Sequence, residues 1–169
     1  MGVIEELRTP DVFSISVWFL READHNVALE ATSHKVNNVL IAQASNGNKD
    51  NLEIGTEGTS IEVFLDTEDT SGVASEFMQA ATVMEDQWHH LVVTYDSSAA
   101  NELKFFLDGR LVGERNEPGG LVADNAPSPF TIGLSRPGGS AWGGFEGLID
   151  DVAIWEAALD IQQVAALWS

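Results

Sequence analysis

A tryptophan within a glycine-rich stretch is the residue of this sequence with the clearest binding chemistry. Trp142 lies in residues 138–144, GGSAWGG, where its neighbours offer few side chains to pack against. An exposed indole ring presents a flat apolar surface to one face of a sugar ring, and nearby polar groups bind the hydroxyls. Trp142 is therefore a candidate ligand-binding residue. The alternative is that its ring folds back and packs over the edge of the domain.

Three further residues have chemistry suited to the same kind of ligand. Trp18 ends the polar row of the alternating segment 12–20, which predicts that its ring lies on the face of a strand opposite the core. Core packing is the alternative for this ring. Arg136 and Asn46 lie in turn-forming sequence and can form hydrogen bonds with hydroxyl groups. Trp142, Trp18, Arg136 and Asn46 form the predicted ligand-binding set.

The histidines do not form a metal site in the predicted structure. His89 and His90 are adjacent on a predicted strand, so their side chains point to opposite faces and cannot share an ion. We expect Trp88 and one of these histidines to lie in the core, and Trp155 and Trp168 to be buried between the terminal helix and the sheet. Cysteine is absent, which excludes disulfides and thiolate chemistry.

The charge of the chain limits the classes of partner. The sequence has 27 acidic and 8 Lys plus Arg residues, for a formal net charge of −19. Such a chain repels phosphate backbones and anionic membranes, so nucleic acid is excluded as a partner and divalent cations are favoured. Acidity also keeps proteins soluble without any specific ligand. No apolar run approaches the roughly 18 residues of a membrane span, which excludes direct membrane insertion.

Strand patterns with turn residues between them recur along most of the chain. The clearest turn is Asp108-Gly109, a strong hairpin signal between segments 102–108 and 110–114. Helical spacing appears only after Asp160, a predicted N-cap. The pattern predicts an all-β fold, a two-sheet antiparallel sandwich with one short C-terminal helix, in a single domain over residues 1–169 that is either complete or a module of a larger protein. The other predicted strands are 12–20, 39–44, 52–55, 61–65, 77–83, 88–96, 130–134 and 145–155.

Four sequence blocks together resemble one family. They are FSISVW at 13–18, WHHLVVTYD at 88–96, FLDG at 106–109 and GLIDDVAIW at 147–155. In this order and spacing they resemble the laminin-G-like jelly rolls of the concanavalin A-like lectin and glucanase superfamily. The resemblance implies a jelly roll that opens with a further strand, and only residues 3–7 can supply it.

The resemblance also suggests an enzyme activity that the residues do not support. Related glucanases carry Glu-x-Asp-x-x-Glu on one strand, which places two carboxylates at the separation that a retaining mechanism needs. Here Glu22-Ala23-Asp24 is followed by Val27 where the second glutamate belongs. A retaining glucanase is therefore not expected.

A structural calcium ion is a further implication of the resemblance. Many jelly rolls of the superfamily hold such an ion between the N-terminal segment, a loop and the last strand. The last-strand ligand corresponds to Asp150, and the turn that contains Asp50 is the candidate loop contribution. A hydrogen-bonded strand-end carboxylate is the alternative for Asp150. Asp151 is expected to point to the opposite face as a structural or surface group.

The resemblance implies a non-enzymatic, extracellular binding module that recognises carbohydrate or glycoprotein and is stabilised by calcium. A secretion signal would then lie outside this chain. The main alternative is a structural or adhesive interaction module, or an accessory subunit of a larger surface assembly, without a sugar ligand. A divergent glycoside hydrolase is the third alternative. Exposed rings in a groove favour sugar binding, a flat apolar patch favours protein assembly, and convergent carboxylates in a cleft favour the enzyme.

Overall fold

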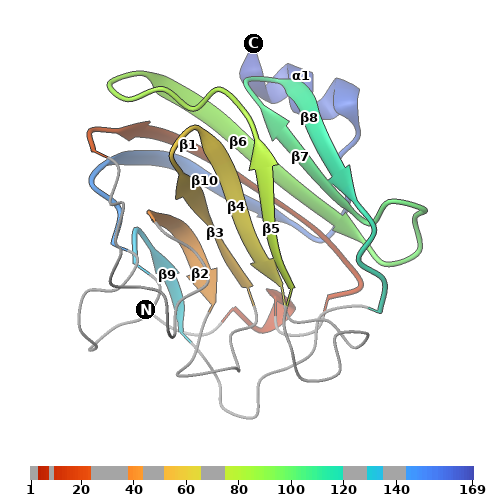
Figure 1. The fold of residues 1–169 in the computed structure, drawn as a ribbon. Helices are drawn as coiled ribbons and strands as arrows, with labels where there is room; N and C mark the ends of the chain where they lie inside the picture. Colours follow the sequence, from red (N-terminus) through yellow and green to blue (C-terminus); the bar gives the residue numbers. More distant parts are fainter. Residues whose placement is uncertain are drawn as a thin grey trace.

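Two five-stranded antiparallel sheets form a jelly-roll sandwich, which confirms the predicted fold class (Figure 1). The computed structural model describes residues 4–7, 10–23, 38–43, 52–65, 75–119, 129–134 and 144–169. The first sheet has the order β10 (Gly147–Trp155), β1 (Val12–Arg21), β6 (Trp88–Asp96), β7 (Leu103–Leu107) and β8 (Arg110–Arg115). The second sheet has the order β5 (Ser75–Ala80), β4 (Ser60–Leu65), β3 (Leu52–Glu57), β2 (Val39–Gln43) and β9 (Phe130–Ile132).

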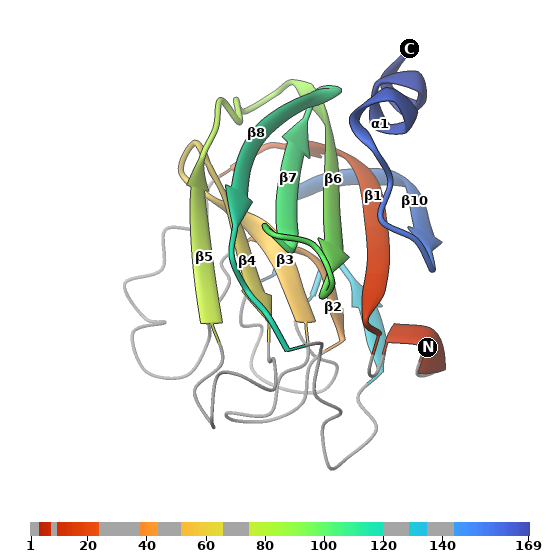
Figure 2. The ribbon, with the colours of Figure 1, turned by 90° about the vertical axis from the view of Figure 1, so that its right-hand side faces the viewer.

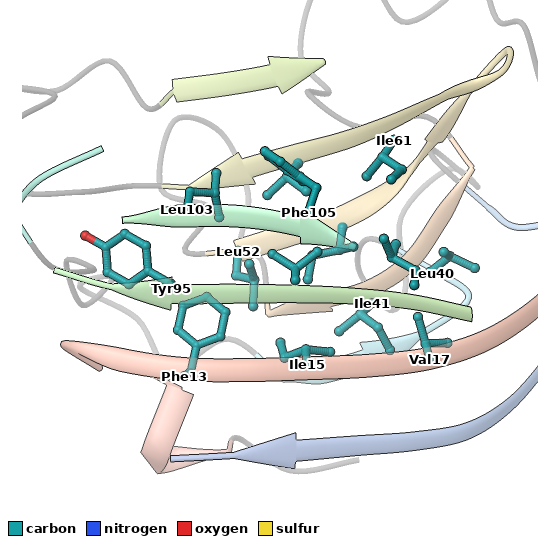
Figure 3. Close-up of a cluster of buried hydrophobic side chains, with 14 of the residues drawn as sticks. Phe13, Ile15, Val17, Leu40, Ile41, Leu52, Ile61, Tyr95, Leu103 and Phe105 are labelled. Carbon is teal, nitrogen blue, oxygen red and sulfur yellow. The ribbon is translucent and has the colours of Figure 1, made fainter. Parts of the chain in front are cut away.

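The core lies between the two sheets and follows from strict alternation along the strands. β1 directs its phenylalanine and β-branched residues inward, as the sequence predicts. Side chains from both sheets fill the space between them, and Figure 3 shows Phe13, Ile15 and Val17 facing Leu40, Ile41 and Leu52. Each fully buried side chain of this size contributes about 1.5–3 kcal/mol relative to exposure. This core holds the two sheets at a fixed separation.

The outer face of the first sheet is covered at one end by the C-terminal segment. Ser14 points outward, yet it is fully buried beneath this segment. Its hydroxyl donates to the Ala157 carbonyl (2.6 Å) and accepts from the Leu159 amide (2.9 Å). Ser16, the next outward residue, is also buried. This end of the outer face is covered because the segment after β10 folds back over it, whereas Trp18 and Leu20 further along β1 are half-buried.

Helix α1 (Ile161–Trp168) continues this cover and lies beyond β7 and β8, on the side away from the second sheet (Figure 1). Asp160 is the predicted N-cap, and its carboxylate accepts from the amides of Gln162 and Gln163. The Gln163 side chain accepts in return from the Asp160 amide, which completes a capping box. Val164 is the buried anchor of the helix.

The predicted Asp-Gly hairpin joins β7 and β8. Asp108 and Gly109 have φ values of 52° and 73°, and a type I′ turn requires positive φ at both central positions. Gly109 meets a second constraint, because a Cβ atom there would lie 3.0 Å from the Trp168 Cβ. The end of α1 therefore lies directly against this turn.

The beginning of the described chain differs from the expectation of an opening strand. Glu5–Leu7 forms a 3₁₀ helix, and Leu7 is buried in the core. The backbone amide and carbonyl of Ile4 bond to the Gln43 side chain, so this segment is bound by a side chain of β2 rather than by a strand ladder. No helix in the described part of the chain has the length and apolar character needed to span a membrane.

The outer face of the second sheet has a small apolar cluster of its own, formed by Val39, Ala42 and Phe64. Glu53 pairs with Ala42 and Phe64 across the neighbouring strands, so it shares this face. Glu62, which lies two residues before Phe64 on β4, pairs with Gly55. Glu53 and Glu62 are 0% and 1% exposed, so this outer face carries two buried carboxylates.

Candidate functional site

Aromatic rings converge on the outer face of the first sheet, where β1 meets the end of α1. The half-buried ring of Trp18 stacks on Trp168, with ring centroids 4.9 Å apart and an interplanar angle of 12°. It also stacks on His90 of β6, at 5.0 Å and 23°. Trp18 therefore lies opposite the core, as the sequence predicts. Figure 2 shows β1 and β10 side by side, with α1 next to them.

His90 is the buried polar group at the centre of this cluster. Its Nε2 atom lies 2.7 Å from the Ser16 hydroxyl, whereas its buried Nδ1 atom has no hydrogen-bond partner among the described residues. Burial lowers the pKa of His90 below its usual value of 6.5, and the Asp108 carboxylate only partly offsets this effect. The imidazole is therefore neutral at pH 7. Its Nδ1 atom retains unused hydrogen-bonding capacity.

A β-bulge in β10 places two adjacent carboxylates at the edge of the cluster. The register passes from Ser16↔Ala153 to Trp18↔Asp150, so β10 has one residue more than β1 over this interval. Asp151 takes up the difference with a φ of 46°. The Asp150 carboxylate accepts from the Asp151 amide at 2.9 Å, and both side chains are exposed.

An open pocket of about 310 Å³ lies between the aromatic cluster and the bulge of β10. This volume is at the lower end of the range of small-ligand pockets, about 300–1,000 Å³. The pocket combines aromatic rings with a carboxylate, a hydroxyl and an imidazole, and no Lys or Arg is among its described lining residues. Those residues are Ser16, Trp18, His90, Asp151, Val152, Ala153, Trp155 and Leu167. Rings with a few convergent polar groups are the features that sugar binding requires.

His89, the neighbour of His90 on β6, has a structural role. The Met84 amide donates to His89 Nε2 at 3.0 Å, so Nδ1 carries the proton and donates to the Asp108 carboxylate at 2.9 Å. Asp108 also accepts from the His90 amide at 3.0 Å. His89 therefore connects the hairpin turn to β6, and both of its ring nitrogens are used.

The described residues do not form a nucleophilic or metal centre. Ser16 and His90 are at the distance of a nucleophile and its base, but Asp108 bonds to the His90 backbone rather than to Nδ1. The third member of a triad is therefore missing here. Within the described ranges, no three His, Asp or Glu side chains are grouped closely enough to hold a metal ion. The arrangement is suited to binding.

The predicted site residues have different outcomes. Trp18 lines the pocket, and Asp150 lies at its edge as the cross-strand partner of Trp18. The expectation that Asp151 points to the face opposite Asp150 is wrong. The bulge interrupts the alternation of side chains, and Asp151 lines the pocket with Trp18. Trp142, Arg136, Asn46 and Asp50 lie outside the described residues.

The tryptophan predictions also need correction. Trp88 is 42% exposed rather than part of the core, and both neighbouring histidines are buried. Trp168 is 39% exposed, although it was expected to be buried between the helix and the sheet, and Trp155 is half-buried and lines the pocket. The spacing of Val164 and Trp168 on one helix face was the available signal that α1 adds a ring to this surface.

A model of the concanavalin A-like lectin/glucanases superfamily matches residues 5–165. The chain belongs to this superfamily. A search of curated proteins finds no match. Similar solved structures show the same fold at low sequence identity. The carbohydrate-binding module CBM40 of the Ruminococcus gnavus IT-sialidase, bound to α2,3-sialyllactose, has a TM-score of 0.72 and 13% identity over 96% of this chain and 85% of that one.

Two other solved structures extend the comparison. A heptameric SAP-like pentraxin from Limulus polyphemus has a TM-score of 0.65 and 15% identity, with 99% of this chain and 74% of that one covered. Domain 4 of AbnA, an extracellular arabinanase from Geobacillus stearothermophilus, was solved in complex with arabinotriose. It has a TM-score of 0.62 and 17% identity over 94% of this chain and 67% of that one. A carbohydrate-binding module is therefore among the solved structures that share this fold.

Proposed function

We propose that this chain is a non-enzymatic, extracellular carbohydrate-binding module and that the pocket beside Trp18 is a sugar site. The observation that carries the proposal is the pocket itself, in which Trp18 and Trp155 lie beside Asp151, Ser16 and His90. The rings supply apolar surface for a pyranose or furanose face. The Asp151 carboxylate accepts hydrogen bonds from sugar hydroxyls, which offsets the cost of removing both groups from water.

Membership of a lectin and glucanase superfamily supports this function, as do the sugar-bound modules among the similar structures. The similarity to a domain of an extracellular arabinanase supports an extracellular setting for the ligand, which we propose to be a free carbohydrate or the glycan of a glycoprotein. The absence of the glucanase spacing in the sequence supports binding without hydrolysis.

A glycan panel, screened with calcium and again with chelator, tests the proposal directly. Trp18→Leu and Asp151→Asn should each weaken binding about tenfold or more, because they remove a ring face or a charged acceptor. Asparagine tolerates the positive φ at this position, so Asp151→Asn keeps the backbone. Ile132→Ala, on the second sheet, is the control. Full binding by both pocket variants would place the ligand elsewhere.

We also propose that calcium stabilises the fold, with Asp150 as one ligand and Asp50 in the loop contribution. Asp150 is exposed and accepts only one hydrogen bond that the structure describes, so its carboxylate has coordination capacity left. Calcium should then raise the melting temperature of the wild type but not of Asp150→Ala. Equal melting temperatures with calcium and with chelator would refute the ion.

A structural or adhesive interaction module is the second candidate. Exposed apolar side chains on the first sheet, Leu148 and Trp88, favour it. This function replaces carbohydrate binding if the domain binds no glycan, with calcium or with chelator, and instead self-associates or captures a purified neighbouring subunit.

A further inference from the structure

Beyond the pocket, a row of exposed apolar side chains continues along the outer face of the first sheet. Leu20 of β1 pairs with Leu148 of β10 on one side and with Trp88 of β6 on the other. In antiparallel pairs such residues point to the same face. Leu148 and Trp88 are 51% and 42% exposed, so the row is open to solvent.

This row lies next to the aromatic cluster, further along β1. Trp18, two residues before Leu20, has Asp150 and His90 as its cross-strand partners. From Ser16 in the pocket to Leu20 in the row, the strand advances about 13 Å. The apolar surface therefore extends past a single sugar ring and is continuous with the proposed site.

The exposed charged residues that the structure describes beside this surface are acidic. Asp150 and Asp151 lie at the edge of the pocket, and the exposed Glu146 precedes β10. Arg21, at the end of β1 beyond the row, is 3% exposed and contacts Thr56 and Glu85.

On the helix side, Arg110 lines a neighbouring cavity together with Trp168 and Asp108. No described Lys or Arg side chain lines the pocket itself. Carboxylates accept hydrogen bonds from hydroxyls but repel anionic sugars, and the net charge of −19 adds to this repulsion.

We infer that the outer face of the first sheet binds an extended segment of a neutral polysaccharide, with one sugar in the pocket and following sugars over Leu20, Leu148 and Trp88. This inference rests on the proposed function. A protein partner fits less well, because stable interfaces need about 800 Å² on each side with a centre depleted in charge. Here the apolar row is narrow and Asp150 lies beside it.

The test is titration calorimetry of the wild type with neutral polymers (arabinan, xylan and mixed-linkage β-glucan), their mono- to hexasaccharides, and two anionic probes, polygalacturonate and α2,3-sialyllactose. Affinity should rise at least tenfold from the monosaccharide to the longer oligosaccharides of one neutral polymer, and both anionic probes should fail to bind. Trp88→Ala should lower affinity for the polymer about tenfold and leave monosaccharide binding unchanged. Leu148→Gln, in the same row, should act in the same direction.

Ile132→Ala is the matched control, because Ile132 is 39% exposed but belongs to β9 of the second sheet. Circular dichroism establishes that each variant is folded. Three results would overturn the inference and leave the pocket function standing. They are tight binding of an anionic probe, an affinity that does not depend on chain length, and unchanged polymer affinity in both row variants. A wild type that binds no sugar would overturn both, and self-association abolished by Trp88→Ala would then assign the row to a protein contact.

Discussion

The outer faces of the two sheets use aromatic and acidic residues in opposite ways. On the first sheet, rings such as Trp88 and Trp168 are about two-fifths exposed, and Asp150 and Asp151 are open to solvent. On the second sheet, Phe64 is buried together with the carboxylates of Glu53 and Glu62. The same residue types are therefore exposed to solvent on one face, where we propose ligand contact, and packed internally on the other.

This difference shows that residue chemistry identifies a site only together with exposure. A buried carboxylate must be compensated within the fold, because an isolated buried charge is costly. An exposed carboxylate beside a ring remains free to accept a hydrogen bond from a ligand. We therefore expect the outer face of the second sheet to contribute to stability and that of the first sheet to carry the proposed binding.

The largest expected effect tests the stability side of this assignment. Phe64→Ala should lower the free energy of unfolding by about 3–5 kcal/mol, because it leaves a cavity beside Val39 and Ala42. Urea denaturation measures this loss. Glycan affinity of the folded variant should stay at the wild-type value, and a folded variant that has lost binding would move the site to the second sheet.

A smaller effect is expected where stability and binding meet. Val164 anchors α1 on Val92 and Phe106, so Val164→Ala should cost about 2 kcal/mol of unfolding free energy. The helix also carries Leu167 and Trp168, and glycan affinity should fall with their loss of order. Thermal unfolding and calorimetry report the two effects separately. Unchanged affinity would show that the helix does not contribute to the site.

Loss of the N-cap should have a milder effect at the same place. Asp160→Ala removes the acceptor for two helix amides and should cost about 1 kcal/mol. Asp160→Asn, which retains a capping side chain, is the matched control. Amide hydrogen exchange should increase in α1 and remain unchanged in β3 and β4. Equal protection in α1 would show that packing on Val164 alone fixes the helix.

The smallest expected effect is in pH dependence. Burial lowers the pKa of His90 below 6.5, so the unfolded state binds more protons than the folded state as pH falls through 6.5. The contribution of His90 to stability is therefore present above this pH and declines below it. His90→Gln should lose less stability than the wild type between pH 7.5 and 5.5, a window above the usual titration of carboxylates. Parallel stability curves would contradict the pKa shift.

Much of the fold could be predicted from local sequence patterns. Alternation in β1 identified the residues that face the core, and Asp108-Gly109 and Asp160 marked a turn and a cap whose geometry depends on a few adjacent residues. The opening 3₁₀ helix was missed because residues 3–7 have a strand-like composition, while the pairing that decides their structure involves the distant Gln43.

Only part of the candidate site could be predicted, since it depends on long-range contacts. Trp18 was placed on the correct face, but nothing near it indicated that Trp168 stacks on it. The bulge at Asp151 reverses the expected direction of a side chain, and one extra residue in a strand leaves no local signal. Trp88 was assigned to the core because its block resembles a framework element, whereas it pairs with Leu20 on the outer face of the sheet and is 42% exposed.

The position of β1 between β6 and β10 also has a consequence for folding kinetics. The hydrogen bond from Ser14 to Ala157 joins residues 143 positions apart, and the Ser16–His90 contact joins residues 74 apart. Closing such long loops costs entropy before the contacts stabilise the chain, which places antiparallel sandwiches among the slow folders, in the millisecond to second range. The β7–β8 hairpin forms from neighbouring residues, whereas the binding surface forms only when the two ends of the chain meet. Substitutions in α1 should therefore accelerate unfolding more than they slow folding.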